Sequence, residues 1–400
     1  MIRAFRPTTL ARIPRGIWML GLVSLLMDVS SEMVHSLLPV FMVGTLGASA
    51  FTLGLVEGAS EATALVVKVF SGAWSDHVGR RKPLTLLGYT IGALSKPLFA
   101  IAGSPAAVLG ARLLDRTGKG IRGAPRDALV ADLAPPDLRG AAFGLRQSLD
   151  TIGAFVGPLL AIGLMLLWAN DVRAVFWVAI VPGLMAVAVL LFGVQEPPRA
   201  AAAQRINPIK REAWRRLGRA YWWVVGLGAV FMLARFSEAF LVLRAVQGGL
   251  ALAWTPLVLL GMSLVDTLAA YPLGKLSDSV GHRKLLAAGL ALLIGADLAL
   301  AQGTQWGWLV AGIALWGLHM GMTQGLLARM VADTAPAELR GTAFGVFNLA
   351  SGVALFIASA AAGAVWERFG ATQTFFVGAA FGALALLLLA LRPSGSMPTA

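Results

Sequence analysis

The stretch GAWSDHVGRRKPL at residues 72–84 occurs again, with changes, as GKLSDSVGHRKLL at residues 274–286. Both copies place an aspartate three residues before a glycine that basic side chains follow. The two aspartates, Asp76 and Asp278, are 202 positions apart in a chain of 400 residues. A motif that returns after half the chain length suggests that the protein consists of two similar halves.

A second pair of stretches repeats at nearly the same distance. LVADLAPPDLRGAAFG at residues 129–144 is similar to MVADTAPAELRGTAFG at residues 330–345, and their arginines Arg139 and Arg340 are 201 positions apart. Two unrelated motifs that share one offset are hard to obtain by chance. The sequence therefore predicts an internal duplication.

Long apolar runs occupy the chain between these motifs. The sequence is 58% hydrophobic and only 13% charged, which is roughly half the charged fraction of a soluble domain. Runs such as FWVAIVPGLMAVAVLLFG (176–193) have about the length that a helix needs to cross a bilayer, and they are continuous rather than alternating, unlike barrel strands. We expect twelve spans, near residues 17–42, 51–71, 84–103, 105–128, 139–168, 173–193, 221–247, 252–273, 284–303, 306–332, 340–368 and 371–391.

One polar stretch, EPPRAAAAQRINPIKREAWRRLGR, separates the sixth expected span from the seventh. The sequence thus predicts an all-α integral membrane protein with twelve transmembrane helices in two pseudo-symmetric six-helix bundles. The bundles are expected at residues 1–195 and 221–400, with a basic cytoplasmic linker at 196–220. Two similar helical halves around a site near the bilayer midplane form the architecture of transporters that work by alternating access.

The positive charge follows the expected topology. The formal net charge is +13. Lys and Arg are concentrated near the N-terminus, in the linker, in GRRKP (79–83) and in GHRKL (281–285), whereas the loops at 44–49, 102–105 and 302–307 contain none. The positive-inside rule then predicts a multi-pass protein of the plasma (inner) membrane with both termini in the cytoplasm. The same rule explains the basic loops without nucleic-acid binding.

With its duplication and twelve expected spans, the chain resembles the major facilitator superfamily over essentially its full length. The family's signature loop between spans 2 and 3 is matched by Gly72, Asp76, Gly79, Arg80 and Arg81, and by a second copy at Gly274, Asp278, Gly281 and Arg283. The resemblance implies secondary active transport by alternating access. It also implies a gating role for this loop, because helix ends and basic side chains can hold its aspartate in one conformation. The alternative is a plain turn whose basic residues set the topology.

A narrower resemblance lies in the span at 139–168. The spacing G-x8-G-x3-G-P of antiporter-type exporters is present as Gly144, Gly153, Gly157 and Pro158. Ala161 and Ile162 replace the glycine pair that usually follows. The motif favours efflux, and ordinary glycine-mediated helix packing is the alternative.

The densest charge of the chain falls inside an expected span, in LLDRTGKGIRGAPRD at residues 113–127. An ionisable group at bilayer depth costs several kcal/mol unless it is paired or hydrated. Steps of three and four residues lead from Arg112 to Asp115, Lys119, Arg122 and Arg126, and they place all five side chains on one helix face. We expect this charged stripe to face the interior of the protein.

Neighbouring spans contain acidic and basic side chains that can neutralise the charges of the stripe. Several of them lie four residues apart, and therefore on one face of their helix. The predicted charge network comprises Asp28, Glu32, Glu57, Glu61, Arg112, Asp115, Arg116, Lys119, Arg122, Arg146 and Asp150. Lys68 and Lys96 complete the charge balance and receive no individual role.

This network suggests proton coupling. A carboxylate in a dry cavity can exchange its basic partner for a proton as the cavity opens to each side in turn. The candidate titrating acids are Asp28, Glu32 and Asp150, and their candidate partners are Arg112, Arg116 and Arg122. Purely structural ion pairing and the binding of an anionic substrate by the arginines remain alternatives.

The second half has fewer charges in its spans, so we expect it to supply a softer wall for the substrate. Its candidate cavity residues are Arg235, Glu238 and Asp266; Arg244 and Asp297 are further charges without an assigned role. The counterpart of the charged stripe, ALWGLHMGMTQGLLARM (314–330), has lost nearly all of its charge. His319 beside Met320 suggests a metal, but gap filling by methionine is the stronger interpretation and no metal site is predicted.

Several functional classes are excluded. The sequence contains no HExxH, no GxSxG and no P-loop, so we expect neither an enzyme nor an ATP-driven pump. It contains no cysteine, which excludes disulfides and thiolate metal sites, and no cofactor is expected. We expect a monomeric secondary transporter that exports a small solute in exchange for protons. The alternatives are uptake or exchange of a small anion or nutrient, metal efflux, and a sensor on a transporter scaffold.

Overall fold

A computed structural model of the chain describes residues 12–78, 80–196, 217–303, 305–323, 325–336 and 339–391. Within these ranges the chain is helical and contains no strand, and most of the predicted linker (197–216) lies outside them. Among the described residues, ten helical segments are long and apolar enough to cross a membrane. Two more complete the set of twelve: α6 (Pro105–Leu133), which contains the charged stripe, and α14 (Trp306–Thr323). The predicted all-α fold with twelve spans is confirmed.

Internal contacts divide the chain into two compact units. The first comprises residues 1–38 and 63–206, and the second comprises residues 39–62 and 207–400. Residues 39–62 thus belong by contact with the second half, although the sequence places them in the first. The division into bundles at 1–195 and 221–400 stays a prediction.

Helix α4 (Ala50–Val78) is the element that the two units share. Its first half packs closely against α16 (Arg340–Phe369) within the second unit, because a side chain at Gly54 would collide with the backbone oxygen of Ser359. Gly363 in α16 faces the backbone at the start of α4 in the same way. Small residues at both surfaces allow this backbone-to-backbone contact.

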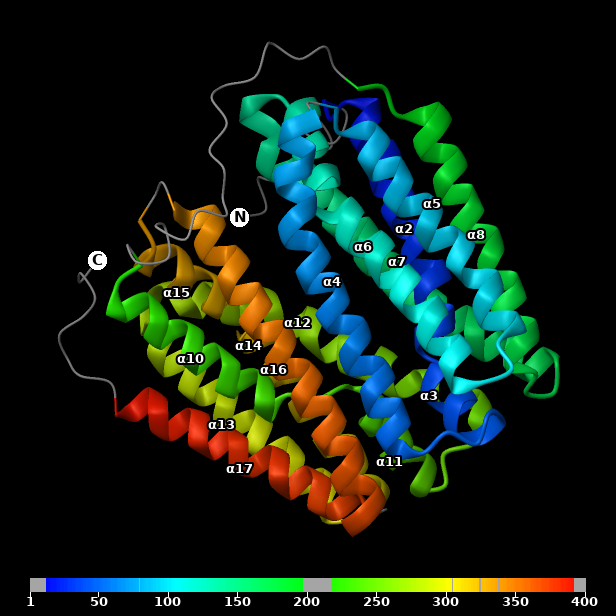
Figure 1. Ribbon diagram of the computed structural model, residues 1–400, viewed down its shortest axis with the longest axis vertical. Coiled ribbons are helices and arrows are strands. Elements are labelled where there is room, and N and C mark those ends of the chain that lie inside the picture. The colour runs from blue at the N-terminus through cyan, green and yellow to red at the C-terminus, as the bar shows by residue number, and fades with distance from the viewer. Residues whose placement is uncertain are drawn as a thin grey trace. The chain divides into compact units, whose positions relative to one another are not determined.

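The remaining helices of the first unit are α2 (Arg15–His35), α5 (Lys82–Ile101), α6, α7 (Arg139–Leu167) and α8 (Val172–Gly193), with the short 3₁₀ helix η3 (Pro136–Leu138) before α7. Polar side chains begin two of them: Ser104 accepts a hydrogen bond from the amide of Ala107 in α6, and Asp171 accepts from the amide of Arg173 in α8. Helix α2 packs against α7 and α8, and α5 packs against α6 and α8 (Figure 1).

Helices α5 and α6 cross at a pair of glycines. A side chain at Gly118 would place its Cβ 2.6 Å from the backbone oxygen of Gly88 and 2.9 Å from the amide nitrogen of Gly92. The reverse holds at Gly88, where a Cβ would lie 2.6 Å from the oxygen of Gly118. This close approach brings the polar side chains of α5 to the charged stripe of α6.

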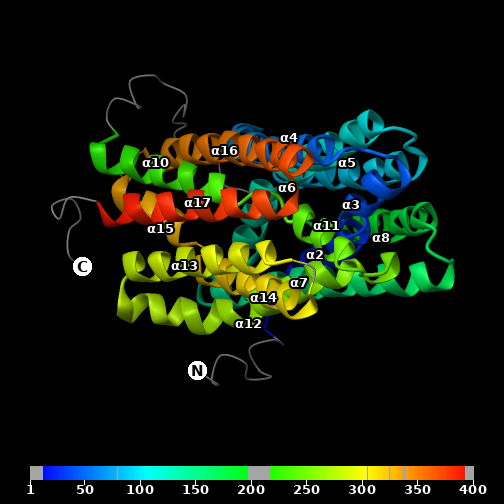
Figure 2. The same ribbon diagram turned by 90° about the horizontal axis from the view of Figure 1, so that it is seen from below.

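The second unit contains α10 (Arg219–Ala234), α11 (Ala239–Gln247), α12 (Pro256–Val280), α13 (His282–Ala301), α14, α15 (Leu326–Thr334), α16 and α17 (Ala371–Ala390). Three short elements complete it: α3 (Leu38–Val40) with the π-helix η2 (Phe41–Thr45), and the 3₁₀ helix η4 (Leu252–Trp254). Helix α13 packs against α14 and α17, and α10 packs against α16 and α17 (Figure 2).

The expected spans at 221–247 and 306–332 are each interrupted, which the sequence did not predict. The first breaks at residues 235–238, where the amide of Ser237 donates to the hydroxyl of Ser359 at 3.1 Å. The hydroxyl of Ser237 in turn accepts from the amide of Ala239 at 3.2 Å. The second span breaks before α15, where Gly325 has a φ of +79° that favours glycine. Protein hydroxyls thus replace part of the hydrogen bonding that the first break removes.

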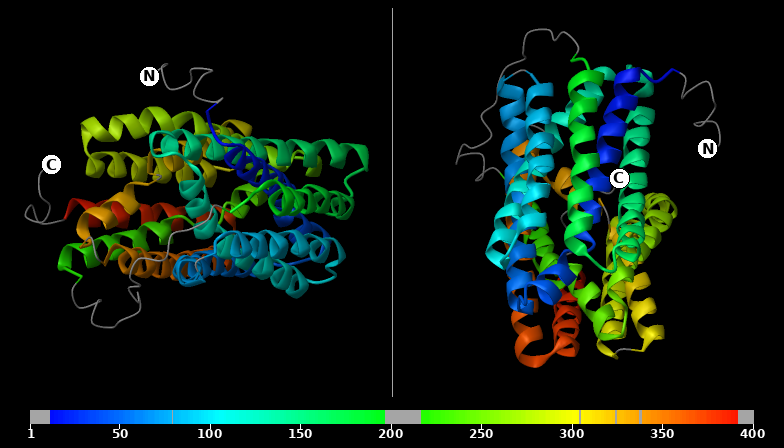
Figure 3. Two further views of the ribbon diagram at one scale, coloured as in Figure 1. Left: turned by 90° about the horizontal axis from the view of Figure 1, so that it is seen from above. Right: turned by 90° about the vertical axis from the view of Figure 1, so that its right-hand side faces the viewer.

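Both units expose large apolar side chains. Phe192 on α8 is 82% exposed, and Phe369 on α16 is 70% exposed. Neither helix forms a polar outer face of the kind that soluble proteins have. Figure 3 shows the long helices from two further sides. Such surfaces are suited to a bilayer, whose acyl chains are as apolar as the side chains.

The glycine crossing of α5 and α6 predicts a sharp difference between two alanine substitutions in α6. Gly118→Ala should lower the apparent free energy of unfolding by about 1–3 kcal/mol, because the new Cβ meets backbone atoms that cannot rotate away. Gly110→Ala is the control, since nothing lies within 4 Å of its Cβ. Thermal unfolding of the purified protein in detergent measures both, and equal stability of the two variants would contradict the close crossing.

Candidate functional site

The charged stripe of α6 lies mostly inside the first unit. Arg112, Asp115, Arg116 and Arg122 are each at most 4% exposed. Lys119 is exposed, but it lies in electrostatic range of Asp28 and Glu32 on α2. A lysine has a flexible four-carbon stem, and its ammonium group can reach water from a helix face that is otherwise buried.

Asp115 is the centre of the buried charges. Its Oδ1 lies 2.7 Å from Nζ of Lys96, and its Oδ2 lies 3.8 Å from Nε of Arg116. Ser95 also donates to Oδ1, and Lys96 donates to the hydroxyl of Ser31 on α2 at 3.1 Å. Each charge therefore keeps a partner at bilayer depth. The sequence counted Lys96 only in the charge balance, and its lone ammonium in an apolar span was the available signal.

Arg122 extends the stripe toward a ring of α5. Its guanidinium carbon lies 4.6 Å from the ring centre of Tyr89, a cation–π contact. Its Nη1 is buried and has no hydrogen-bond partner among the described residues. Gly92 leaves room for this group, since a Cβ there would lie 3.0 Å from Nη1. Nη1 thus has hydrogen-bonding capacity that no described residue uses.

Asp150 on α7 is shared by two arginines. Nη1 of Arg146 lies 3.5 Å from its Oδ2, and Nη1 of Arg126 lies 3.9 Å from its Oδ1. Arg126 also pairs with Asp127 at 3.1 Å and donates to Ser24 on α2 at 3.5 Å. These distances are longer than that of the Lys96 pair, so the attraction is weaker and easier to rearrange.

Asp28 and Glu32 on α2 face the same region. Asp28 lies in electrostatic range of Asp150, Lys119 and Arg122. Glu32 lies 3.5 Å from Nδ1 of His35, three residues further along the helix. Thus two carboxylates from different helices, Asp28 and Asp150, lie in electrostatic range of one another beside the basic stripe.

The glycines of the antiporter-like motif separate into two groups. A Cβ at Gly153 would lie 3.0 Å from Cβ of Asp28, and one at Gly157 would lie 2.8 Å from Cβ of Glu32. These two glycines allow α7 to approach the acidic residues of α2. Gly144 has open space around it, so it makes no comparable approach, and Pro158 lies inside α7.

Glu57 and Glu61 lie in the half of α4 that belongs to the second unit. Glu57 is 1% exposed and Glu61 is half-buried. Their place in the charge network stays a prediction.

The signature loop of the first half shows one ion pair. Nε of Arg81 lies 2.9 Å from Oδ2 of Asp132, near the end of α6. Arg80 is exposed. Gly72 and Asp76 lie in α4, but their side-chain surroundings are outside the description, and Gly79 lies outside the described residues altogether. The partner Asp132 was missed, although it belongs to the repeated VAD motif.

The second copy of the loop holds a helix end. Arg283 donates from Nη2 to the backbone oxygens of Leu389 and Ala390, at 2.8 and 2.9 Å, at the C-terminus of α17. In the first half Lys82 donates in the same manner to the oxygen of Leu191, at 2.8 Å. Gly281 has a φ of +84°, which favours glycine at this turn. The side chains at Gly274 and Asp278 lie outside the description.

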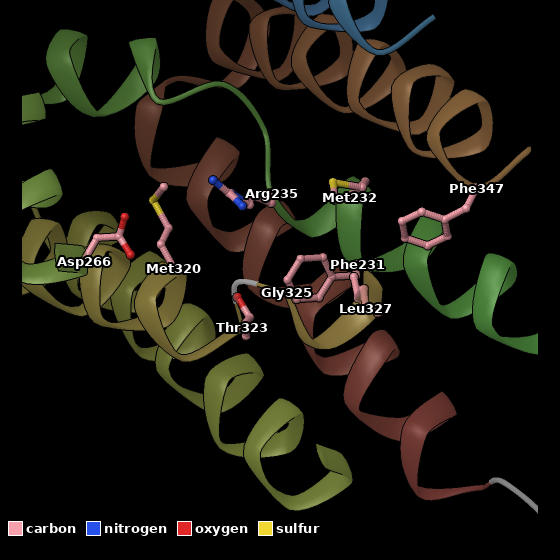
Figure 4. Close-up of a pocket in the computed structure, with 9 residues that line it drawn as sticks. All are labelled: Phe231, Met232, Arg235, Asp266, Met320, Thr323, Gly325, Leu327 and Phe347. Carbon is pink, nitrogen blue, oxygen red and sulfur yellow. The ribbon is translucent and has the colours of Figure 1, made fainter. Parts of the chain in front are cut away.

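A cavity of about 210 Å³ opens in the second unit. It is lined by Phe231, Met232, Arg235, Asp266, Met320, Thr323, Gly325, Leu327 and Phe347, which Figure 4 shows. Asp266 and Phe347 lie at opposite sides of the cavity in this view. The cavity therefore has a charged side and an aromatic side, as binding sites for small organic molecules do.

The charged side of the cavity has one acid in excess. Nη2 of Arg235 lies 3.3 Å from Oε1 of Glu238, so these two groups form a pair, although Glu238 does not line the cavity. Oδ1 of Asp266 is buried without a hydrogen-bond partner among the described residues. Behind the wall, His319 stacks on Phe231 with 5.4 Å between ring centres. Its Nδ1 lies 2.7 Å from the oxygen of Gly289.

The Lys96–Asp115 pair predicts strong non-additivity. Asp115→Leu alone should lower the apparent free energy of unfolding by about 3–5 kcal/mol, because it leaves the Lys96 ammonium buried without its main partner. Adding Lys96→Met should restore much of that stability, since both charges are then gone. A double-mutant cycle on the purified protein measures this coupling.

The exposed pair between Arg12 and Asp137, at 2.9 Å, is the control. Asp137→Ala should change stability by no more than about 1 kcal/mol. If the double variant at positions 96 and 115 is as unstable as Asp115→Leu, the buried pair is not the interaction that matters.

Comparison with known proteins agrees with this arrangement. The family model described as Major Facilitator Superfamily matches residues 20–252 and 253–399. An uncharacterized MFS-type transporter of Methanocaldococcus jannaschii is 29% identical over 94% of both chains. The inner membrane transport protein YajR of Escherichia coli is 24% identical over 92% of this chain and 81% of its own.

Solved structures share the fold. The crystal structure of a mutant form of the nucleoside transporter NupG superposes with a TM-score of 0.78 at 15% identity, over 94% of this chain and 98% of NupG. At that identity the likeness concerns the fold alone. The family match, the twelve membrane helices and the paired halves agree with one another. The chain belongs to the major facilitator superfamily and is a multi-pass secondary transporter of small molecules, not an enzyme.

Proposed function

We propose that this transporter exports a small solute in exchange for protons. The observation that carries the proposal is the acid pair beside α6. Asp150 is held by Arg126 and Arg146 at 3.5–3.9 Å, and Asp28 lies in electrostatic range of Asp150 and of the basic residues Lys119 and Arg122. Such a pair can hold one proton more or less without breaking the stronger contacts around Asp115.

The exchange follows from simple charge balance. A proton that binds Asp28 or Asp150 converts a carboxylate to a neutral acid, and the attraction to the arginines of α6 and α7 weakens. Loss of the proton restores the attraction. Because the affected groups lie on α2, α6 and α7, the packing of these helices responds to protonation. A helix arrangement that differs between the two protonation states is the requirement for coupled transport.

The contact between α2 and α7 supports the antiporter interpretation. Gly153 and Gly157 bring α7 next to Asp28 and Glu32, so that part of the motif borders the acids that we assign to proton exchange. Gly144 does not take part in this contact. The position of the two glycines supports efflux as the direction of transport.

The cavity of the second unit is the proposed binding site for the solute. Arg235 and Asp266 supply its polar groups, while Phe231 and Phe347 supply apolar surface. A solute with one polar end and one apolar end fits this distribution. Glu238 then acts by holding Arg235 in place.

The signature loop is the proposed gate on the cytoplasmic side. The pair of Arg81 and Asp132 fixes the start of α5 to the end of α6, at 2.9 Å. By the positive-inside rule, the basic loops support a cytoplasmic position for this side, the linker and both termini. We further propose that the protein works as a monomer in the plasma membrane.

Transport of a small anion is the second candidate. Nη1 of Arg122 is buried and without a hydrogen-bond partner among the described residues, and such a group could bind a carboxylate or phosphate. The excess acid in the second-unit cavity disfavours an anion there. Metal efflux has less support, because no three His, Asp or Glu side chains gather into a metal site in the part of the chain that the structure describes.

Growth inhibition decides between these functions. Cells without the gene and cells that overexpress it are compared on a panel of inhibitors that includes organic compounds, metals and arsenicals. Greater sensitivity on deletion supports export, and loss of growth on one nutrient or anion supports uptake. The compound found in this way is then followed in proteoliposomes under an imposed pH gradient.

Replacement of the shared acid gives a direct prediction. Asp150→Asn should reduce pH-gradient-driven flux to the level of empty vesicles, because the amide cannot exchange a proton. Solute exchange without a gradient should continue. Asp137→Asn is the control, since Asp137 is exposed at the surface and should leave flux unchanged. Wild-type gradient-driven flux in Asp150→Asn would exclude Asp150 from coupling.

A further inference from the structure

Asp297 is a buried acid that the network of the first unit does not include. It lies on α13 in the second unit and is 0% exposed. Both of its carboxyl oxygens are buried, and neither has a hydrogen-bond partner among the described residues. A carboxylate in such a place lacks both water and a donor, and the free-energy cost of keeping it charged is high.

No neighbouring charge in the described part of the chain compensates for this burial. The charged or titratable side chains described on the packing elements are His319 on α14, Asp266 on α12, Arg244 on α11, and Arg235 and Glu238 in the break before α11. None of them forms a hydrogen bond or ion pair with Asp297. Helix α17 contributes no charged residue.

The end of α13 also opposes a negative charge. Asp297 lies four residues before the last residue of the helix, Ala301, where the backbone dipoles leave a partial negative charge. Arg244 is near this end, but its Nε donates to the oxygen of Leu300 at 2.9 Å and its Nη2 donates to that of Ala301 at 3.4 Å. The guanidinium is thus directed to the helix end and not to the carboxyl group.

The ring of Phe236, in the break between α10 and α11, lies close to the carboxyl group of Asp297. A Cβ at Gly378 on α17 would lie 2.6 Å from Oδ2 of Asp297 and 2.8 Å from the ring of Phe236. The acid and the ring therefore meet at the same glycine. Phe236 belongs to the break between α10 and α11, and it packs on Trp316 and Phe375 with ring centres 5.5 and 5.7 Å apart. Any rearrangement of the break moves the ring that lies next to the acid.

We propose that Asp297 is a proton-binding site of the second unit. It holds its proton while Phe236 packs beside it, and it releases the proton when the break between α10 and α11 moves. Binding converts the carboxylate and one proton to the neutral acid, and release returns the proton to water that enters beside α13. The structure thus assigns to the second half a proton site of its own, separate from the acids beside α6. Only the role of Asp297 in coupling rests on the proposed function; its protonation does not.

Infrared difference spectroscopy of the protein in lipid tests the protonation state. Subtracting the spectrum of Asp297→Asn from that of the wild type at pH 7 should leave the C=O band of a protonated carboxylic acid. Asp297→Glu should shift this band rather than remove it, which keeps the test valid if the asparagine variant folds poorly. Asp333→Asn, at an exposed acid, should show carboxylate bands only. Carboxylate bands from Asp297 itself would overturn the proposal.

The role of the ring is tested by hydrogen exchange. In deuterated buffer the acid band of the wild type should shift slowly, because Phe236 shields the group from water. Phe236→Ala should accelerate the shift, and Phe192→Ala, at a ring that is 82% exposed on α8, should not. Equal exchange rates in all three proteins would overturn the gating by the break.

Flux separates this inference from the proposed function. With the compound that the growth panel identifies, Asp297→Asn should keep solute exchange and lose accumulation under a pH gradient. If wild-type flux ignores the gradient while the acid band is present, the proposed function fails and the proton site stands. If wild-type flux follows the gradient and Asp297→Asn is identical to it, the coupling role of Asp297 is wrong and the proposed function stands.

Discussion

A charge placed among lipid chains has to find its partner inside the protein, and the contact between Lys96 and Asp115 is a close instance of this rule. Its atoms lie 2.7 Å apart and its side chains are almost fully buried. The glycine crossing of α5 and α6 exists at the same place, because only glycine lets two backbones approach closely enough for short side-chain contacts. Ser95 and Ser31 form hydrogen bonds with the pair, and Arg116 adds an ionic contact at 3.8 Å. The charged stripe is therefore a packing element as well as a polar one.

Much of the architecture could be predicted from the sequence because it is encoded locally. Continuous apolar runs define spans without knowledge of their neighbours, and a repeated motif such as that around Asp76 and Asp278 reveals the duplication. Helical spacing also predicted that Arg112 and Asp115 share a face. The break at residues 235–238 could not be found in this way, since the hydroxyl of Ser359 that supports it lies 122 positions away along the chain.

The individual partners were less predictable than the faces. The lysine at position 119 has the spacing of the buried charges of α6 but is exposed, and periodicity alone does not give this difference. Lys96 had no pattern around it, and only the crossing of two helices identifies it as the partner of Asp115. The first half of α4 belongs by contact with α16, a relation that neither hydropathy nor motif spacing contains. Tertiary contacts decide such cases.

The two units solve the problem of buried polarity differently. In the first, acids and bases neutralise one another across helices. In the second, single groups such as Asp266 and Asp297 have carboxyl oxygens without hydrogen-bond partners among the described residues. Paired charges can be rearranged at small cost, whereas isolated acids respond mainly to water and protons. A duplicated fold thus combines a unit that exchanges ion pairs with one whose polar groups respond to what enters from outside.

Each unit also fastens its own last helix. Lys82 binds a carbonyl group in the last turn of α8, and Arg283 binds those of α17, both from the start of the third helix of their half. The closing helix is thereby secured by its own half and not by the segment that follows it. Each half has its own hydrogen bonds between a basic side chain and the end of its last helix. The chain between the halves can therefore change in length and composition, or even be cut, without releasing either of these helices.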